Sequence, residues 1–406
     1  MIKISKYSVL VLPLVFAANT ALGAGFGLYE FSARGNAMGG AVLAGEAEPA
    51  SIALNPALIT DLKGSQVQAG STFVTARARV AYNGETTDPK HAFWALPNFF
   101  YTQQINDKLF TGIGIFERFG LSNTYEDKTW AGAKNIYDVG LTSVSVQPTV
   151  AYKVTDRLSA AAGLEVMYFK FQEKKMAEIK PYPGLYDTKI DADGVGVSPM
   201  LALAYKANEK VNFGASFRFR TKEAMTGTSN STFPALNSDV RGDVTMPAQL
   251  AMGVSYKPID DLLVEFNWTN IFWSSFDSID IDFKDTNVAT SDKKEWKDTY
   301  RIGFGAEYKL TPKIRLRGSY IYDKSPVNND YMDVMVPVDN RHLIGTGAGF
   351  DLGKNYTLDL SYTYLIGTSL GGHTPIKIGD NASDIDSISY SNGSGQLAGI
   401  SIRHSF

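Results

Sequence analysis

The side chains that most often carry out chemistry are scarce in this 406-residue chain. It has no cysteine, and its four histidines lie far apart, at His91, His342, His373 and His404. Without cysteine there is no thiolate metal site, cysteine nucleophile or disulfide framework. The chain also lacks a Gly-x-Ser-x-Gly elbow, a His-Glu-x-x-His helix and a glycine-rich phosphate loop. We therefore expect no enzyme, no cofactor and no metal site.

Amino-acid composition excludes further classes of protein. The chain has 39 basic and 42 acidic residues, and its 12% of aromatic residues is too high for a disordered chain. The near-balance of charge excludes a basic nucleic-acid-binding protein. The mean hydropathy of −0.12 is that of a soluble protein, but an average conceals strands with one apolar and one polar face.

The first 23 residues have the form of a secretory signal peptide. Lys3 and Lys6 precede an apolar run over 9–18, and Ala21-Leu22-Gly23 offers the small residues of a cleavage site. The alternative is a buried N-terminal helix. No later apolar run is long enough for a membrane-spanning helix.

From about residue 66 onward, apolar and polar residues alternate. One example is the run from Tyr300 to Leu310, in which every second residue is apolar or alanine. Successive side chains of a strand point to opposite faces, so each such segment has one apolar and one polar face. Soluble sandwiches share this pattern, but strands of about 12 to 18 residues exceed the usual length of about 5 to 6.

Fourteen strands are predicted, near 66–82, 93–105, 108–125, 139–154, 157–171, 191–207, 210–225, 240–257, 261–275, 296–310, 313–324, 339–352, 355–367 and 394–406. Short turns and long polar segments alternate between them. Bacterial outer-membrane barrels combine an even strand number with tight periplasmic turns and long external loops. The chain ends on Phe406, and this terminal aromatic resembles the signal read by the barrel assembly machinery.

Residues 24–65 do not alternate, and their small, apolar composition suits a segment that fills a barrel lumen. We therefore predict an all-β fold: a 14-stranded antiparallel transmembrane β-barrel over 66–406, with an N-terminal hatch (plug) over 24–65 inside the lumen, behind a signal peptide over 1–23.

Several ordered motifs resemble the FadL family of outer-membrane transporters for long-chain fatty acids and other hydrophobic compounds. They are Ala24-Gly25-Phe26 followed by Glu30-Phe31-Ser32, then Asn55-Pro56-Ala57, Lys297-Asp298-Thr299-Tyr300-Arg301-Ile302, Asp323-Lys324-Ser325-Pro326-Val327, and Pro337 with Asp339 and Arg341. The resemblance implies capture of a hydrophobic ligand by external loops, transfer to a site beside the N-terminus, hatch rearrangement, and lateral exit at a kink in the third strand.

The resemblance also implies roles for individual residues. Phe26 would touch the ligand, and Gly120, between Phe119 and Leu121, would form the kink of the lateral gate. Asn55-Pro56-Ala57 would shape the hatch. Lys175 falls where the family has a basic headgroup contact, and Lys293 lies beside a second such position. The alternatives are a hatch packing residue for Phe26, a lumen-facing glycine for Gly120, and exposed loop residues for both lysines.

The expected function is passive transport of hydrophobic compounds, above all long-chain fatty acids, in the outer membrane of a Gram-negative bacterium. The alternatives are an aromatic-hydrocarbon channel of the same family, a general or substrate-specific porin, and an adhesive surface barrel. Expected partners are hydrophobic small molecules, outer-membrane lipid and lipopolysaccharide, and the barrel assembly machinery through Phe406. We expect a monomer that binds no nucleic acid.

Overall fold

The computed structural model describes residues 25–90, 92–125, 128–179, 181–286, 288–336, 339–375 and 385–406. The predicted signal peptide, Ala24, His91 and Pro337 lie outside these residues. The description below concerns the described part of the chain.

Fourteen stretches of chain cross from one end of the barrel to the other and form its wall. The continuous ones are β1 (Ser65–Tyr82), β3 (Ala92–Gln104), β6 (Asp138–Lys153), β7 (Leu158–Glu178), β8 (Leu185–Lys206), β17 (Ile314–Asp323), β18 (Arg341–Gly353), β19 (Tyr356–Gly367) and β21 (Ile385–Ser405). The interrupted ones are β4 (Leu109–Phe116) with β5 (Gly120–Thr124), β9 (Val211–Arg218) with β10 (Thr221–Ser231), β11 (Ser238–Met246) with β12 (Gln249–Ile259), β13 (Leu262–Ile271) with β14 (Ser278–Phe283), and β15 (Val288–Lys293) with β16 (Thr299–Thr311). Two short strands, β2 (Glu85–Thr87) and β20 (Leu370–Pro375), pair with β1 and β21.

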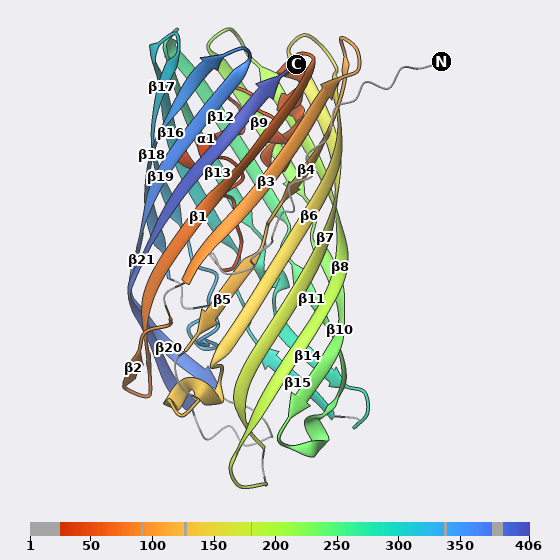
Figure 1. Cartoon of the computed structure of the whole chain (residues 1–406), viewed down its shortest axis with the longest axis vertical. Coiled ribbons are helices and arrows are strands. Elements are labelled where there is room, and N and C mark those ends of the chain that lie inside the picture. Colours follow the sequence, from red (N-terminus) through yellow and green to blue (C-terminus); the bar gives the residue numbers. More distant parts are fainter. Residues whose placement is uncertain are drawn as a thin grey trace.

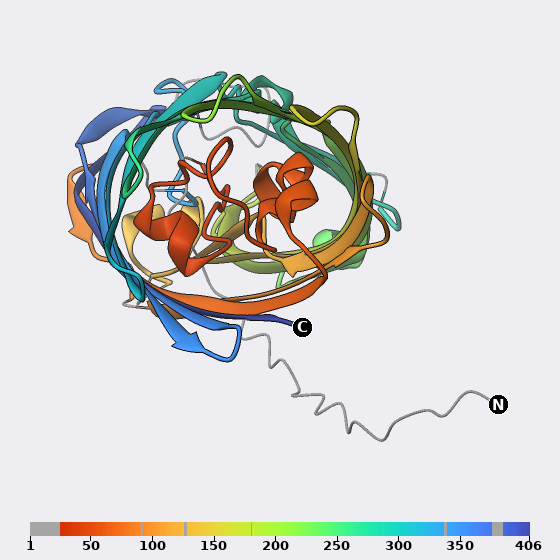
Figure 2. The same cartoon turned by 90° about the horizontal axis from the view of Figure 1, so that it is seen from above.

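Antiparallel pairing closes the sheet into a barrel. Each crossing stretch pairs with its neighbour in sequence, and β1 pairs with β21 from Gln66↔Ser405 to Tyr82↔Ile388. Figure 1 shows the strands tilted around a common axis, and Figure 2 shows the closed ring from one end. Closure leaves no stretch without a neighbouring partner on either side, as lipid requires. The predicted fourteen-stranded antiparallel barrel is confirmed.

The two faces of the wall differ as the alternation predicts. On β6, the inward side chains Ser143, Ser145, Gln147 and Thr149 are buried. The outward Val146 and Val150 are 36% and 52% exposed, although they are apolar. The barrel therefore presents an apolar surface to its surroundings and a polar surface to its lumen.

The N-terminal segment lies inside the ring, near the end with the short turns (Figures 1 and 2). It contains α1 (Ala33–Ala37), α2 (Ser51–Leu54) and the 3₁₀ turn η1 (Pro56–Asp61). Three further 3₁₀ turns lie in the connections: η2 (Ala131–Lys134), η3 (Pro234–Leu236) and η4 (Trp273–Ser275). No helix among the described residues is both long and apolar enough to cross a membrane.

Local sequence signals explain the short helices of the hatch. Ser32 caps α1, since its Oγ accepts a hydrogen bond from Gly35 N. Asn55 caps η1 in the same way, with its Oδ1 accepting from Ala57 N, and Pro56 occupies the first position of the turn. Gly39 has a positive φ of 65° in the turn that ends α1.

Polar side chains of the wall hold the hatch in place. Arg34 pairs with Glu307 of β16 at 3.2 Å, and Glu265 of β13 accepts hydrogen bonds from the backbone N–H groups of Leu43 and Ala44. Wall glycines let the hatch approach closely: a Cβ on Gly214 would lie 1.8 Å from Leu43 O. The hatch is therefore in direct contact with the wall.

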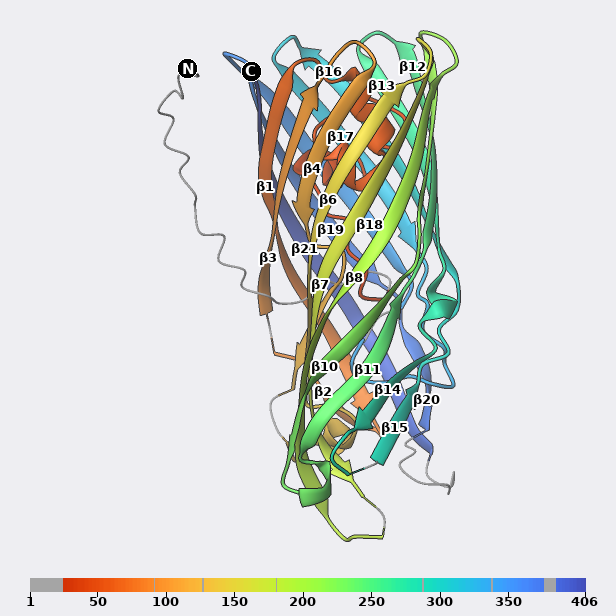
Figure 3. The same cartoon turned by 90° about the vertical axis from the view of Figure 1, so that its right-hand side faces the viewer.

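Several strands extend further than the sequence predicts. The segments near 172–190, 226–239 and 276–295 were expected to be loops. Instead, β7 and β8 stay paired up to Glu178↔Leu185, and β10, β11, β14 and β15 continue the sheet beside them. Figure 3 shows this extension at the end opposite the C-terminus. Cross-strand pairing thus overrides a polar composition that is more typical of loops.

Candidate functional site

The third crossing stretch is broken in its middle. β4 ends at Phe116 and β5 begins at Gly120, so residues 117–119 leave the ladder. Ser143 of β6 bridges the break, because its Oγ accepts a hydrogen bond from Phe119 N at 2.9 Å and donates one to Phe119 O at 2.8 Å. The sequence predicts a kink at Gly120, and the break lies immediately before that residue.

The break leaves part of β3 unpaired on one side. β3 pairs with β4 between Phe99 and Gln104, and no described strand pairs with residues 92–98 on that side. Pro97 lies in this unpaired part, and proline has no N–H to offer to a neighbouring strand. On its other side, β3 keeps a continuous ladder with β1. The wall therefore lacks described strand pairing between residues 92–98 of β3 and β5.

The start of the hatch occupies this place. Leu28 N donates to Arg118 O at 2.7 Å, and Gly120 N donates to Phe26 O at 2.9 Å. Gly27 and Phe119 form an antiparallel bridge between these two bonds. Residues 26–28 thus form a short extended segment that pairs with residues 118–120 of the broken third stretch.

Gly120 provides room for this contact. Its φ is not positive, but a Cβ there would lie 3.2 Å from Cδ1 of Leu28. A larger side chain would press on the hatch. The neighbours Phe119 and Leu121 are buried in the largest apolar cluster of the lumen.

Phe26 is fully buried in a cage of aromatic rings. Its ring centroid lies 4.9 Å from Trp273, 5.2 Å from Phe276, 5.5 Å from Trp296 and 5.8 Å from Phe119. Such edge-to-face and tilted contacts are favourable beyond their buried area. The cage has no charged member, so it suits an apolar group.

Apolar residues continue from the cage toward the long loops. The same cluster contains Tyr125, Trp130, Val334, Met335 and other buried residues of the connections. Hydrogen bonds fix the loop over it: Tyr125 OH donates to Val334 O at 2.7 Å, and Asn123 Nδ2 donates to Met335 O at 2.6 Å. One apolar cluster thus extends from the cage to the loop residues Val334 and Met335.

The two predicted lysines occupy different surroundings. Lys175, on β7, is partly buried with its Nζ 2.7 Å from Glu173 Oε1. Lys293, at the end of β15, has a side chain that is 64% exposed and lies 3.8 Å from Glu295. No cation–π contact between described residues joins either lysine to a ring of the cage.

Sequence reasoning missed Lys294. Its side chain is 1% exposed, and its Nζ pairs with Asp292 at 2.8 Å and with Asp333. Lys175 lies within electrostatic range of it. Trp296 of the cage is two residues away, but Lys294 follows the end of β15 and Glu295 has a positive φ of 43°, so no strand period marks Lys294 as the inward cation.

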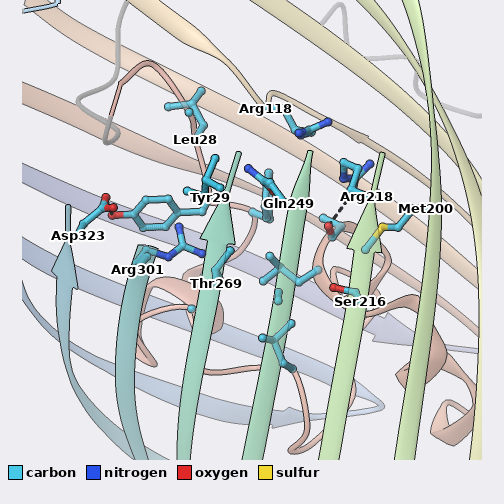
Figure 4. Close-up of a pocket in the computed structure, with 18 of the residues that line it drawn as sticks. Leu28, Tyr29, Arg118, Met200, Ser216, Arg218, Gln249, Thr269, Arg301 and Asp323 are labelled. Carbon is cyan, nitrogen blue, oxygen red and sulfur yellow. Dashed lines mark hydrogen bonds between the residues drawn. The ribbon is translucent and has the colours of Figure 1, made fainter. Parts of the chain in front are cut away.

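A cavity of about 30 Å³ lies between the hatch and the wall. Figure 4 shows side chains from the hatch and from neighbouring strands around it. Its described lining includes three arginines, Arg118, Arg218 and Arg301, and one carboxylate, Asp323. Leu28 and Trp273 contribute apolar surface. Among the described residues, no group of acidic or histidine side chains could hold a metal ion.

One end of this cavity carries a buried charge cluster. Glu165 Oε2 accepts from Arg118 Nη1 at 2.5 Å and from Arg218 Nη1 at 2.9 Å. Arg218 Nη2 also donates to Ala53 O of the hatch at 2.9 Å. The cluster therefore connects the broken third stretch to the hatch. The strand pattern predicts inward polar residues but does not reveal which of them meet.

Asn55 is also fully buried. Its Nδ2 donates to Leu43 O at 2.6 Å and to Leu203 O at 3.1 Å, while its Oδ1 accepts from Ala57 N at 3.1 Å. Asn55 and Pro56 therefore fix the turn of η1 and attach it to β8.

A closed barrel with an apolar outer face, a polar lumen and a folded N-terminal plug defines a plugged β-barrel of the bacterial outer membrane. Comparison with known families agrees. The family model for outer membrane protein transport proteins (OMPP1/FadL/TodX) matches residues 14–406, and the chain belongs to this family. The family consists of transport proteins, not enzymes.

Similar proteins cover nearly the whole chain. Outer membrane protein P1 of Haemophilus influenzae is 24% identical, over 93% of each chain. The long-chain fatty acid transport protein of Salmonella typhi is 22% identical, over 89% of this chain and 92% of the relative. The crystal structure of a Pseudomonas aeruginosa FadL homologue superposes with a TM-score of 0.85 at 17% identity, covering 94% of this chain and all of the other. The Ralstonia pickettii toluene transporter TbuX gives 0.71 at 19% identity, over 93% and 98%.

Proposed function

We propose that this protein carries hydrophobic compounds, with long-chain fatty acids as its main cargo, passively across the outer membrane. The observation that supports this most is the pairing of hatch residues 26–28 with the broken third stretch. Displacement of this segment would open the wall sideways, between β3 and β5. The names of similar proteins, which include long-chain fatty acid transport proteins, point to the same cargo.

The proposed route begins at the external loops and continues to the aromatic cage. An aliphatic chain gains about 0.8 kcal/mol for each methylene that leaves water, so it can enter an apolar lining without an energy source. In the cage it would compete with Phe26. Release of the hatch segment would then let it pass beside Phe119, Gly120 and Leu121 into the membrane, without crossing the aqueous periplasm. The headgroup contacts proposed from the sequence are Lys175 and Lys293.

Aromatic hydrocarbons are the second candidate cargo. The cage around Phe26 has no charged member, and aromatic rings pack well against other rings. A similar fold is found in a toluene transporter. A porin is a weaker alternative, because the hatch fills the lumen.

An uptake comparison tests these candidates. The protein would be expressed in cells that lack their own transporter, and uptake of a long-chain fatty acid and of toluene would be measured. We expect a clear gain in fatty-acid uptake. A gain for toluene alone would favour the hydrocarbon channel. Steady, large ion currents from purified protein in planar bilayers would favour a porin.

Gly120→Val tests the lateral exit. The valine side chain would enter the contact with Leu28, where a Cβ already lies 3.2 Å from Cδ1. We expect lower uptake, while the barrel still assembles and shows heat-dependent migration on gels. Gly318→Val is the matched control, since a Cβ there meets nothing within 4 Å. Unchanged uptake in Gly120→Val would refute the assignment.

The remaining partners follow from the location. We propose contact with outer-membrane lipid and lipopolysaccharide, action as a monomer, and recognition of Phe406 by the barrel assembly machinery. Phe406 is 73% exposed at the end of the last strand. It therefore lies within reach of an assembly factor.

A further inference from the structure

Arg301 is a buried cation without an ion pair. It lies on β16, is 5% exposed, and no described side chain forms a hydrogen bond or salt bridge with its guanidinium. Its Nε is buried without a partner. The group lies over the ring of Tyr29, with its central carbon 3.7 Å from the ring centroid. A buried guanidinium without an anion is costly, so its presence needs an explanation.

The nearest carboxylates are engaged elsewhere. Asp323 accepts hydrogen bonds from Arg341 and, at 3.5 Å, from Tyr29 OH. Glu30 Oε2 accepts from Tyr29 N at 2.9 Å, and burial raises the pKa of Glu30. Neither carboxylate comes within salt-bridge distance of Arg301. Glu30 lies within electrostatic range of Arg301, but no described side chain forms an ion pair with the guanidinium.

Arg301 borders the cavity between the hatch and the wall (Figure 4). The cavity also has Arg118 in its lining, whose Nη2 is buried without a partner. Gln249 and Thr269 add polar groups, and Trp273 connects the cavity to the aromatic cage. The lining of the cavity is therefore cationic, the cage is apolar, and the two lie next to each other at Trp273.

The cavity is small in this arrangement. About 30 Å³ is enough for one or two waters but not for an aliphatic chain. Gly27, Leu28 and Tyr29 form part of its boundary, and they follow directly after Phe26. Displacement of the hatch segment would therefore enlarge the cavity and expose Arg301 to the cage.

We propose that Arg301 binds the carboxylate headgroup of an amphiphilic cargo on the inner side of the aromatic cage. This inference rests on the proposed function and sets its substrate class: aliphatic carboxylates rather than uncharged hydrocarbons. A carboxylate pairs with a guanidinium through two charge-assisted hydrogen bonds. An uncharged hydrocarbon leaves the buried cation without a partner.

Binding of matched probes tests this inference. The probes are a terminally brominated undecanoic acid and its methyl ester, at mildly alkaline pH, with quenching of tryptophan fluorescence as the readout. A charge-assisted contact contributes about 1.5–3 kcal/mol, so we expect the wild type to prefer the acid by at least about tenfold. Arg301→Gln should abolish this preference while ester binding remains, and Arg301→Lys should keep part of it.

Arg157→Gln, in an exposed turn, is the matched control and should keep the full preference. Equal binding of acid and ester by the wild type would overturn the inference, even if a variant failed to fold. A full preference in Arg301→Gln would overturn it as well.

Cell uptake separates a failure of the proposed function from a failure of the headgroup assignment to Arg301. If neither probe enters cells that express the wild type, the proposed function is wrong. If both enter equally through the wild type and Arg301→Gln, only the headgroup assignment is wrong.

Discussion

Replacing Asn55 by alanine should loosen the hatch while leaving the barrel closed. The Asn55 side chain makes three hydrogen bonds, to Leu43 O, Leu203 O and Ala57 N. These bonds fix η1, attach it to the loop after α1, and attach both to β8. None of them belongs to the ladder that closes the barrel, so assembly should continue.

The size of the effect follows from the three bonds. Each hydrogen bond contributes about 0.5–1.5 kcal/mol net, so their loss should destabilise the docked hatch by about 1.5–4.5 kcal/mol. If opening of the hatch is a two-state equilibrium, the open population should rise roughly tenfold to a thousandfold. The alanine side chain has no hydrogen-bonding group. Water does not replace the lost bonds in the docked hatch, because Asn55 is fully buried.

Single-channel recording in planar bilayers measures this directly. Asn55→Ala should produce frequent openings without added cargo, and hydrogen exchange of the hatch amides should become faster. Asn106→Ala is the matched control: its Oδ1 also accepts backbone hydrogen bonds, from Lys108 N and Leu109 N, but in an exposed short turn. If Asn55→Ala opened no more often than Asn106→Ala, with unchanged exchange, Asn55 would not be an anchor of the hatch.

Three further changes probe the lumen. Phe26→Ala should cost about 3–5 kcal/mol of hatch packing and shift the tryptophan emission of the cage; wild-type emission would contradict the contact geometry. Lys294→Met should leave the buried Asp333 unpaired and expose the external connections to protease, whereas Lys293→Met should have little effect because Lys293 is exposed. Burial raises the pKa of Glu30 above its ordinary value of 4.5, so the docked hatch binds this proton more tightly than the released hatch. Docking should therefore weaken as pH rises above that ordinary value; channel openings should become more frequent, and Glu30→Gln should reduce this dependence.

The sequence was most informative about the wall. Strict alternation over long segments requires one apolar and one polar face, and only closure satisfies every backbone group in lipid. The period of two also fixes which side chains point inward, as β6 illustrates. The fourteen strands could therefore be predicted without any knowledge of the lumen.

Contacts between distant segments could not be predicted in this way. The bridge between Gly27 and Phe119 joins residues that no local pattern relates. Lys293 is exposed and its neighbour Lys294 is buried, but β15 ends at Lys293, so the alternation of a strand does not extend to Lys294. Arg301 could be recognised as part of a motif, but its missing partner is visible only when its surroundings are known.

Two parts of the hatch are held by different forces. Ile52, Ala57 and Ile59 of α2 and η1 pack into an apolar cluster with Phe100 and Phe110 of the wall, which favours a fixed anchor. Residues 26–28 are held instead by two backbone hydrogen bonds and by the aromatic cage.

Water can replace the backbone hydrogen bonds at small net cost, but it cannot replace Phe26 in the cage. A hydrophobic cargo can, because it buries its own apolar surface there. A ligand shifts an equilibrium only by its differential affinity for the two states. A hydrophobic cargo binds the cage once Phe26 has left it, whereas a polar solute gains nothing in either state. Under the proposed function, the cage itself would therefore make opening of the wall depend on the hydrophobicity of the cargo.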